Sequence, residues 1–256
     1  MMTGTRAYRG RTFVRDTAYI CGDYLEGQIY TMFQQPGVRR NKSKPCSEIQ
    51  AKINERNSLN TLKRIVRLNF TEQDIALHLT YGRESLDLTD ENQVRSNLDR
   101  FMRRLRRLYK KAGVALKYIS VTEKGKKRAR PHHHLIISGG VDRDEIEKLW
   151  GHGYANTRRL RFGEDGCAGL ARYIAKGRCG YRRWNASRNL AHPEPVQHDG
   201  AFTVGEHEDI AEAIEKGCAH DFFESMYPEF ELIDATCVRN AFNRGVYIYY
   251  EMRRRE

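Results

Sequence analysis

The stretch from Arg130 to Ile137 (RPHHHLII) places the strongest constraint on how this chain folds. Three consecutive histidines run into an apolar segment typical of an inner β-strand. Successive side chains of a strand point to opposite faces, so His132 and His134 share one face and His133 takes the other. Two imidazoles two positions apart on a rigid backbone form one edge of a divalent-metal site. Packing alone gains little from such a pair, so the sequence predicts a metal site here.

Glu123 is the candidate for a third ligand. A basic turn joins the strand-like residues 116–123 to the histidine strand, which indicates an antiparallel hairpin. The end of the first strand then lies beside the start of the second, so that Glu123 comes close to His132. A glutamate at a strand end is usually solvated, but beside two histidines we interpret it as a ligand. Two nitrogens and one oxygen, with positions left for water and phosphate oxygens, suit Mg²⁺ or Mn²⁺.

The overall charge points to a polyanionic partner. The 256 residues include 45 Lys and Arg against 33 Asp and Glu, a formal net charge of +12. Nucleic acid is the first candidate partner, and an ordinary basic surface is the alternative. Six scattered cysteines without a Cys-x-x-Cys pair indicate neither a zinc ribbon nor a disulfide framework. We see no secretory signal and no membrane helix, and therefore expect a cytoplasmic protein with no membrane partner and no small-molecule cofactor.

The order of expected elements indicates an α+β fold with a central, mostly antiparallel sheet and flanking helices. Strands are expected at residues 17–32, 76–81, 116–123, 132–138, 153–162 and 245–250. Helices are expected at 47–68, 90–112, 142–150 and 208–224, with one more that ends at Gly177. Residues 188–204 are rich in Pro, His, Asn and Gly, which is typical of a loop.

Tyr173 and Lys176 lie on the helix that ends at Gly177. At helical spacing they fall together on one side of its apolar stripe, where a phenol and an ammonium can address one phosphate. A half-buried aromatic and a charge that favours the helix C-terminus are the alternative reading. That alternative is the more probable one for an isolated Tyr-x-x-Lys pattern.

Taken in order, three motifs resemble those of the HUH endonucleases, in particular the rolling-circle replication initiators of phages, prophages and plasmids. The strand from His78 to Tyr81 (HLTY) resembles their first motif, the histidine strand resembles the second, and Tyr173 to Lys176 (YIAK) resembles the third. The resemblance covers about residues 50–185 and implies the ferredoxin-like palm of that family. It divides the chain into an N-terminal extension with a strand (1–45), an endonuclease core (46–190) and a C-terminal segment packing on that core (191–256), within one compact domain.

The resemblance also implies a reaction, transesterification at an origin of replication in single-stranded or cruciform DNA. Glu123, His132 and His134 would hold the metal, Tyr173 would be the nucleophile that becomes joined to a 5′ phosphate, and Lys176 would stabilise charge. Host helicase and DNA polymerase are the expected partners, because the chain has no helicase motif. Basic residues near both motifs are expected to bind DNA: Lys124, Lys126, Lys127, Arg128, Arg130, Arg178, Arg182 and Arg183.

Two departures from the family pattern leave alternatives open. His133 stands where an apolar residue is usual, so it is either a packed, hydrogen-bonded imidazole or a sign that the register is wrong by one. Gly177 replaces a second tyrosine, which favours a single nucleophile, although Tyr181 stays a candidate second one. Other functions also stay open: a relaxase or transposase of the same superfamily, a non-catalytic DNA-binding protein with a structural metal, or a zinc-dependent nuclease.

Overall fold

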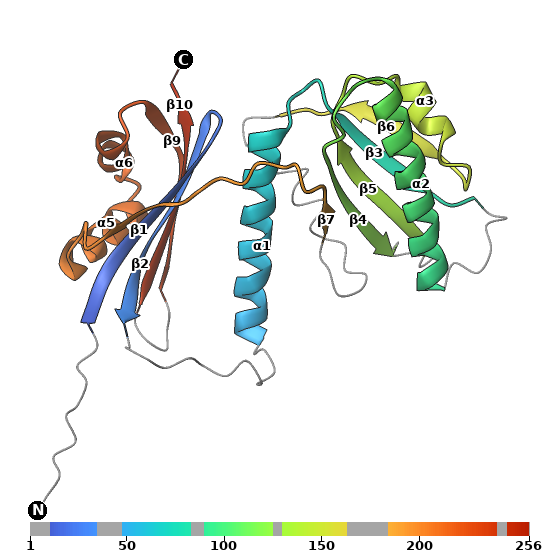
Figure 1. Cartoon of the computed structure of the whole chain (residues 1–256). Helices are drawn as coiled ribbons and strands as arrows, with labels where there is room; N and C mark the ends of the chain where they lie inside the picture. The colour runs from blue at the N-terminus through green and yellow to red at the C-terminus, as the bar shows by residue number, and fades with distance from the viewer. Residues whose placement is uncertain are drawn as a thin grey trace, which may run out of the picture. The chain divides into compact units, whose positions relative to one another are not determined.

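The computed structural model describes residues 11–34, 48–82, 90–124, 130–162, 184–239 and 245–255. By its internal contacts the chain divides into two compact units (Figure 1). We call Lys52–His192 the core unit, and Met1–Ala51 together with Pro193–Glu256 the terminal unit. Each unit is built on a five-stranded sheet whose described pairings are all antiparallel, and the described residues form five helices. The α+β prediction is therefore confirmed.

The core unit contains the sheet that carries the histidine strand. Its strand order is β6-β3-β5-β4-β7. The strands are β3 (Ile75–Thr80), β4 (Tyr118–Lys124), β5 (Pro131–Ile137), β6 (Ala155–Arg159) and β7 (Asn185–Ala186). The helices are α1 (Glu48–Asn69), of which all but the first turn belongs to this unit, α2 (Glu91–Lys111) and α3 (Arg143–Lys148). The strand β5 lies between β3 and β4, as expected of an inner strand.

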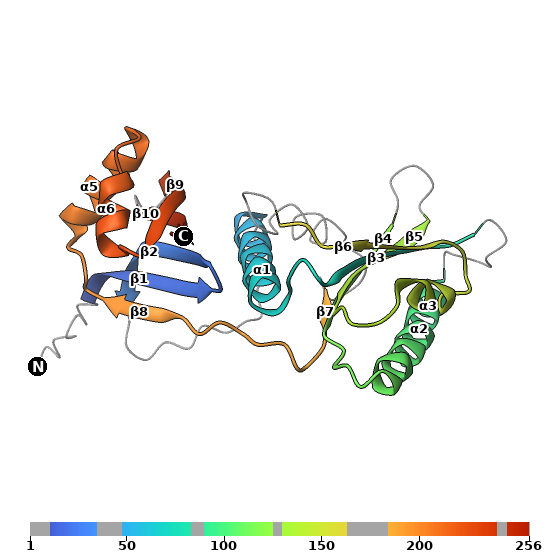
Figure 2. The same ribbon diagram turned by 90° about the horizontal axis from the view of Figure 1, so that it is seen from above.

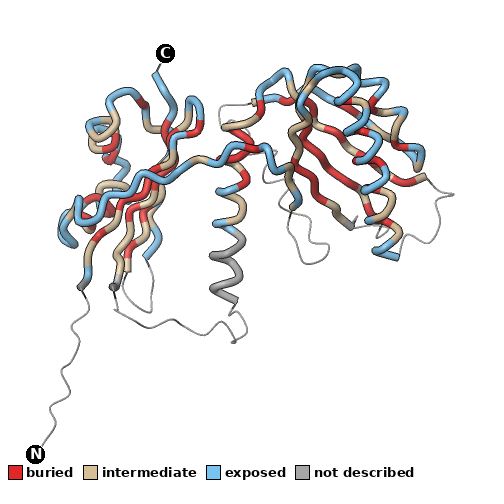
Figure 3. Tube along the Cα trace, in the orientation of Figure 1, coloured by how far each residue is buried: buried red, intermediate tan, exposed pale blue. Residues whose placement is uncertain are grey.

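The two faces of this sheet carry different clusters of buried side chains. Leu135 and Ile137 of β5 face a cluster that includes the apolar stripe of α2 and Trp150 after α3. Ile136 faces the opposite side and belongs to a cluster with apolar residues from the second half of α1. Figure 2 shows α2 and α3 together on one face of the sheet, and Figure 3 shows the buried central strands. Because both faces bury apolar side chains, the register of β5 is strongly specified.

The sequence accounts for the bounds of α2. Six buried residues recur at three- and four-residue spacing and form its core stripe. Asp90 is the N-cap, and its side chain accepts a hydrogen bond from the backbone amide of Asn92. Gly113 follows the helix with a φ of 68°, a conformation that glycine adopts without strain. Asp142 caps α3 in the same way, by accepting from the amide of Glu145.

The terminal unit contains a sheet that combines both ends of the chain, in the order β8-β1-β2-β10-β9. Its strands are β1 (Arg11–Cys21), β2 (Tyr24–Gln34), β8 (Val196–Asp199), β9 (Phe230–Arg239) and β10 (Val246–Arg254). The helices α5 (Val204–Glu215) and α6 (His220–Met226) pack on one face (Figure 1). The three-part division of the chain stays a prediction, but its first and last parts share this sheet.

Several expected elements were wrong in the terminal unit. The single strand at 17–32 is a hairpin of β1 and β2, joined by Gly22 and Asp23 with Gly22 at a φ of 63°. A Gly-Asp pair between apolar runs is a hairpin signal. The loop at 188–204 contains β8, and the single helix at 208–224 is α5 and α6, separated near Gly217 with a φ of 73°.

Candidate metal centre

Three neighbouring strands bring four potential metal ligands to one face of the core sheet. On β5, His132 and His134 share the face that Ile136 continues. The register pairs His132 with Glu123 on β4, and His134 with His78 on β3. In antiparallel strands such paired residues point to the same face, so all four side chains converge. We call His78, Glu123, His132 and His134 the metal-site cluster.

The distances within the cluster are short enough for one ion to be shared. The Oε2 atom of Glu123 lies 3.2 Å from Nε2 of His132 and 3.7 Å from Nε2 of His134. Ring nitrogens of His78, His132 and His134 all lie within 4.8 Å of one another. Two ligands each about 2.1 Å from one ion lie at most about 4.2 Å apart. Small rotations of the imidazole rings therefore suffice to bring all four donors onto one ion.

Burial keeps the imidazoles of the cluster neutral, which is the form that binds a metal. Burial lowers the pKa of His134 to about 3, and the neighbouring His78 and His132 lower it further. The pKa of His78 is also lowered, first by burial and then by the charges of His132 and Arg158. A neutral imidazole presents a free lone pair, so these histidines are ready to coordinate near neutral pH.

Two atoms of the cluster fit a metal better than they fit the protein around them. Within the described residues, the Nε2 atom of His78 and the Oε1 atom of Glu123 are buried and accept no hydrogen bond. A buried polar atom without a partner costs about 1–3 kcal/mol, and such atoms often mark an absent ion or water. Both atoms belong to the same cluster, so a bound divalent ion would satisfy them.

His133 occupies the opposite face of the sheet and is a packed, hydrogen-bonded imidazole. Its side chain is fully buried. Its Nδ1 atom lies 2.9 Å from the hydroxyl of Thr122 on β4, and its Nε2 atom lies 3.1 Å from the phenol of Tyr81, just after β3. Burial, followed by repulsion from the other histidines, lowers the pKa of His133 to about 3. The predicted register is therefore correct, and His133 is not part of the cluster.

Most of the other site residues predicted from the sequence cannot be placed. Tyr173 and Lys176 lie outside the described residues, as do Tyr181, Lys126, Lys127, Arg128, Arg178, Arg182 and Arg183. Lys124 ends β4, but its side chain is not described. Arg130 precedes β5, and its carbonyl oxygen lies 3.4 Å from Nδ1 of His132. The structure thus brings together the predicted Glu123, His132 and His134.

Two residues near the cluster were not assigned a site role from the sequence. His78 was read only as part of a strand motif, yet it stacks on His134 with ring centroids 4.5 Å apart. Arg158 on β6 lies on the same face, beside His78, and its side chain donates to Asn156 at 3.2 Å. The spacing of two between His78 and Thr80 was a usable signal for which face His78 takes. Its partner strand was not predictable from local pattern.

A comparison with protein families agrees with this geometry. Residues 74–178 match the model of the family described as "Replication-associated protein ORF2". The matched segment contains the whole metal-site cluster, and it extends over Tyr173 and Lys176. This match supports a role in the initiation of replication, with DNA as the partner. Neither curated proteins nor solved structures gave a significant match. Among the described residues, no helix is long and apolar enough to cross a membrane.

Proposed function

We propose that this chain is a metal-dependent, sequence- or structure-specific single-strand DNA endonuclease that nicks and rejoins an origin to start rolling-circle replication. The observation that carries the proposal is the convergence of three histidines and one glutamate on one sheet face, inside the segment that matches replication-associated proteins. The proposal places the protein in the cytoplasm with host helicase and DNA polymerase as partners.

The donor set bears on the choice of metal. With His78 included, three nitrogens and one oxygen are available, instead of the two nitrogens and one oxygen expected from the sequence. Imidazole is a poor ligand for Mg²⁺, which favours oxygen and water, whereas Mn²⁺ accepts both kinds of ligand. Of the two ions expected, we therefore propose Mn²⁺. When bound, it would act as a Lewis acid on the scissile phosphate.

The protein's own residues would carry out the transfer in one balanced step. The phenol oxygen of Tyr173 would attack phosphorus while the bond from phosphorus to the 3′ oxygen of the preceding nucleotide breaks. The phenol proton would leave to solvent or to that 3′ oxygen. Lys176 would stabilise the charge that develops on the phosphate, and Arg130 would hold the strand next to the cluster. The freed 3′ hydroxyl primes synthesis, and the reverse reaction closes a circle.

A labelling experiment tests the nucleophile. Single-stranded oligonucleotides tiled across the DNA element that carries the gene are incubated with the protein and Mn²⁺, each labelled at either its 5′ or its 3′ end. The 3′ label should move with the protein in denaturing gels, and the 5′ fragment should be extendable by a polymerase. Tyr173→Phe should abolish the adduct, whereas Tyr181→Phe, the matched control, should retain it. An adduct that survives in Tyr173→Phe refutes the assignment, and cleavage without any adduct indicates a hydrolytic nuclease instead.

The metal is tested separately from the chemistry. Binding of Mn²⁺ to the full chain is followed by electron paramagnetic resonance for His78→Ala, His134→Ala and Glu123→Gln. We expect each variant to raise the Kd at least about 10-fold, the lower end of the loss seen even for outer-shell partners of a metal. The control is His192→Ala, an exposed histidine of the core unit. If His78→Ala behaves like this control, His78 is not a ligand. Nicking that persists after chelation would refute the need for a metal.

A further inference from the structure

The solvent-facing side of α2 carries a concentration of positive charge outside the site described above. This helix has eight basic and two acidic residues in 21 positions, so it holds half of the formal +12 of the whole chain. At 100° per residue, five of the basic residues fall within an arc of about 100° opposite the buried stripe. All five are exposed. We call them the α2 stripe: Arg100, Arg103, Arg107, Lys110 and Lys111.

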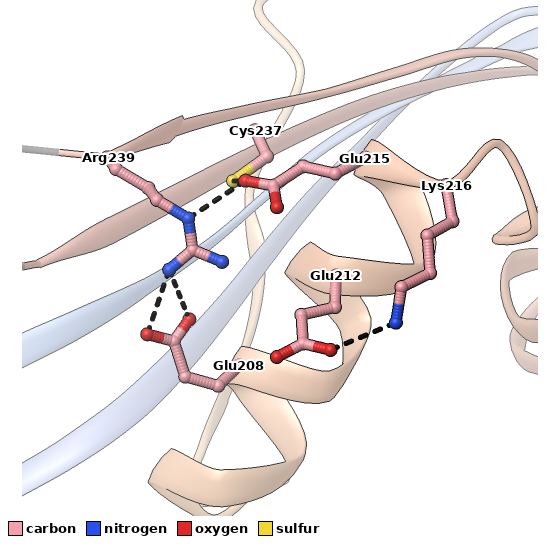
Figure 4. A network of polar contacts seen from close by, with 6 residues as sticks. All are labelled: Glu208, Glu212, Glu215, Lys216, Cys237 and Arg239. Atoms are coloured by element: carbon pink, nitrogen blue, oxygen red, sulfur yellow. Dashed lines mark hydrogen bonds and ion pairs between the residues drawn. The ribbon is translucent and has the colours of Figure 1, made fainter.

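The pairing of these side chains differs from that of basic residues elsewhere in the molecule. In the terminal unit, Arg239 binds Glu208 and Glu215, and Lys216 binds Glu212 (Figure 4). Arg15, Arg254 and Arg255 also form ion pairs with carboxylates. Within the described part of the chain, no member of the α2 stripe has a hydrogen bond or an ion pair. The neighbouring acid on the helix, Asp99, is not paired with any of them either.

Flanking residues of α2 show that the helix does not simply carry unused arginines. Arg104 donates to the carbonyl oxygen of Leu149 at 3.1 Å, and Arg106 donates to the phenol of Tyr118 at 3.0 Å while lying over its ring. These two contacts help to hold the helix on the sheet. The five residues between and beyond them are left for a partner outside the described chain.

We propose that the α2 stripe binds the sugar–phosphate backbone of double-stranded DNA. The stripe extends about 16 Å along the helix at 1.5 Å per residue. One strand of a duplex presents about five phosphates over that length, at about 3.4 Å each, which matches the five cations. Single strands are held by aromatic side chains that stack on bases as well as by charge. Both aromatic residues of α2, Phe101 and Tyr109, are buried in the core, so the stripe offers charge alone.

The position of the stripe separates it from the metal-site cluster. The buried side of α2 packs on the sheet face that carries Leu135 and Ile137, whereas His132 and His134 point to the other face (Figure 2). A strand bound at the cluster therefore cannot be the one held by α2. The inference rests on the proposed function and deepens it: duplex beside the nicking site would be held on the back of the sheet.

The test compares two triple variants of equal charge in the full chain. Arg103→Gln/Arg107→Gln/Lys110→Gln removes the centre of the stripe, and glutamine is a good helix former. Lys148→Gln/Arg188→Gln/Arg253→Gln is the control, with three exposed basic residues from separate places. Binding of a fluorescent random-sequence duplex is followed by anisotropy at several salt concentrations, with circular dichroism as the check on folding. A single strand of the same sequence is measured in parallel.

The stripe variant should lose about 2.7 from the slope of log Kd against log salt, since each phosphate contact contributes about 0.9. Between 50 and 200 mM salt that difference amounts to about 40-fold in the ratio of the duplex Kd values. The control should keep the wild-type slope within about 0.5, and single-strand binding should change by less than about 2-fold. An unchanged duplex slope in the stripe variant overturns the proposal, as does an equal loss in both triple variants or an equal loss of single-strand binding.

These readouts fail independently of those for nicking. If no tyrosine adduct forms but duplex binding depends on the stripe, nicking is refuted and the α2 surface stands. If the adduct forms and the stripe variant binds duplex as the wild type does, the reverse holds. Binding of the stripe to anionic lipid vesicles with no dependence of duplex binding on the stripe would assign the surface to a different partner and overturn the proposal.

Discussion

We predict that His133→Leu lowers the stability of the core unit and weakens metal binding, although His133 is not a ligand. Its two ring nitrogens bind Thr122 on β4 and Tyr81 at the end of β3. These two strands and β5 carry all four residues of the metal-site cluster. The imidazole therefore ties the three strands together directly behind the cluster, and it acts as a positioning residue.

The size of the effect follows from the buried hydrogen bonds. Each polar partner left buried without a hydrogen bond costs about 1–3 kcal/mol. The phenol of Tyr81 keeps a contact of 3.4 Å to the carbonyl oxygen of Val94, and Thr122 is only partly buried, so the lower end of the range applies to both. A loss of about 2 kcal/mol should lower the Tm by about 4–8 °C in a unit of this size. We expect the Kd for Mn²⁺ to rise about 10-fold, as for residues that orient a ligand.

A double-mutant cycle separates the hydrogen bond from simple loss of packing. Thr122→Val should destabilise alone, but in Thr122→Val/His133→Leu both partners are apolar, and the two losses should not add. Thermal unfolding and Mn²⁺ titration are measured for all four proteins. Additive losses in the cycle refute the contact as a source of stability. A Kd for Mn²⁺ that stays at the wild-type value in a destabilised His133→Leu refutes the positioning role.

Three further predictions concern the terminal unit. Gly27→Ala should lower the Tm through a loss of about 3 kcal/mol, because a Cβ at Gly27 would lie 1.9 Å from Cζ of the buried Tyr250; an unchanged Tm in thermal unfolding would contradict this. Burial raises the pKa of Asp16, so its contribution to stability is greatest at low pH and falls as pH rises through the raised pKa. Asp16→Asn should therefore gain on the wild type as pH rises from about 4 in urea titrations, and a constant difference would refute the burial effect. Thr203→Ala should cost about 1 kcal/mol in the same assay, because Thr203 forms a capping box with Glu206, whereas an unchanged urea midpoint would show that this cap adds nothing.

Local pattern was sufficient for the part of the site that lies within one hairpin. The alternation of side chains along β5 separated His132 and His134 from His133, and the short turn before β5 placed Glu123 beside His132. Both inferences depend on periods of two residues and on a register set by a nearby turn. The structure repeats this arrangement, with 3.2 Å between Glu123 and His132. The same logic applied to α2, whose stripe and caps were visible in the sequence.

Elements that depend on distant partners were not visible in the same way. His78 reaches the cluster only because β3 pairs with β5, which follows it by more than fifty residues, and no local period reports such a pairing. The strand β8 is four residues long with every side chain exposed, so no alternation of burial marks it. The strand β9 likewise has mostly exposed or half-buried residues. In each case the partner strand supplies the hydrogen bonds, and the sequence of the segment alone does not indicate it.

The pairing of β3 with β5 changes what the cluster is able to bind. Had β3 paired one residue out of register, Leu77 or Leu79 would face His134, and the cluster would hold two histidines and a glutamate. The observed register exchanges an apolar neighbour for a third imidazole and leaves the Nε2 atom of His78 buried without a partner among the described residues. Such an atom costs free energy until it coordinates an ion, so the register that destabilises the metal-free protein is the one that increases its affinity for metal. Stability gained on Mn²⁺ addition should therefore be larger in the wild type than in His78→Leu, which removes both the cost and the ligand.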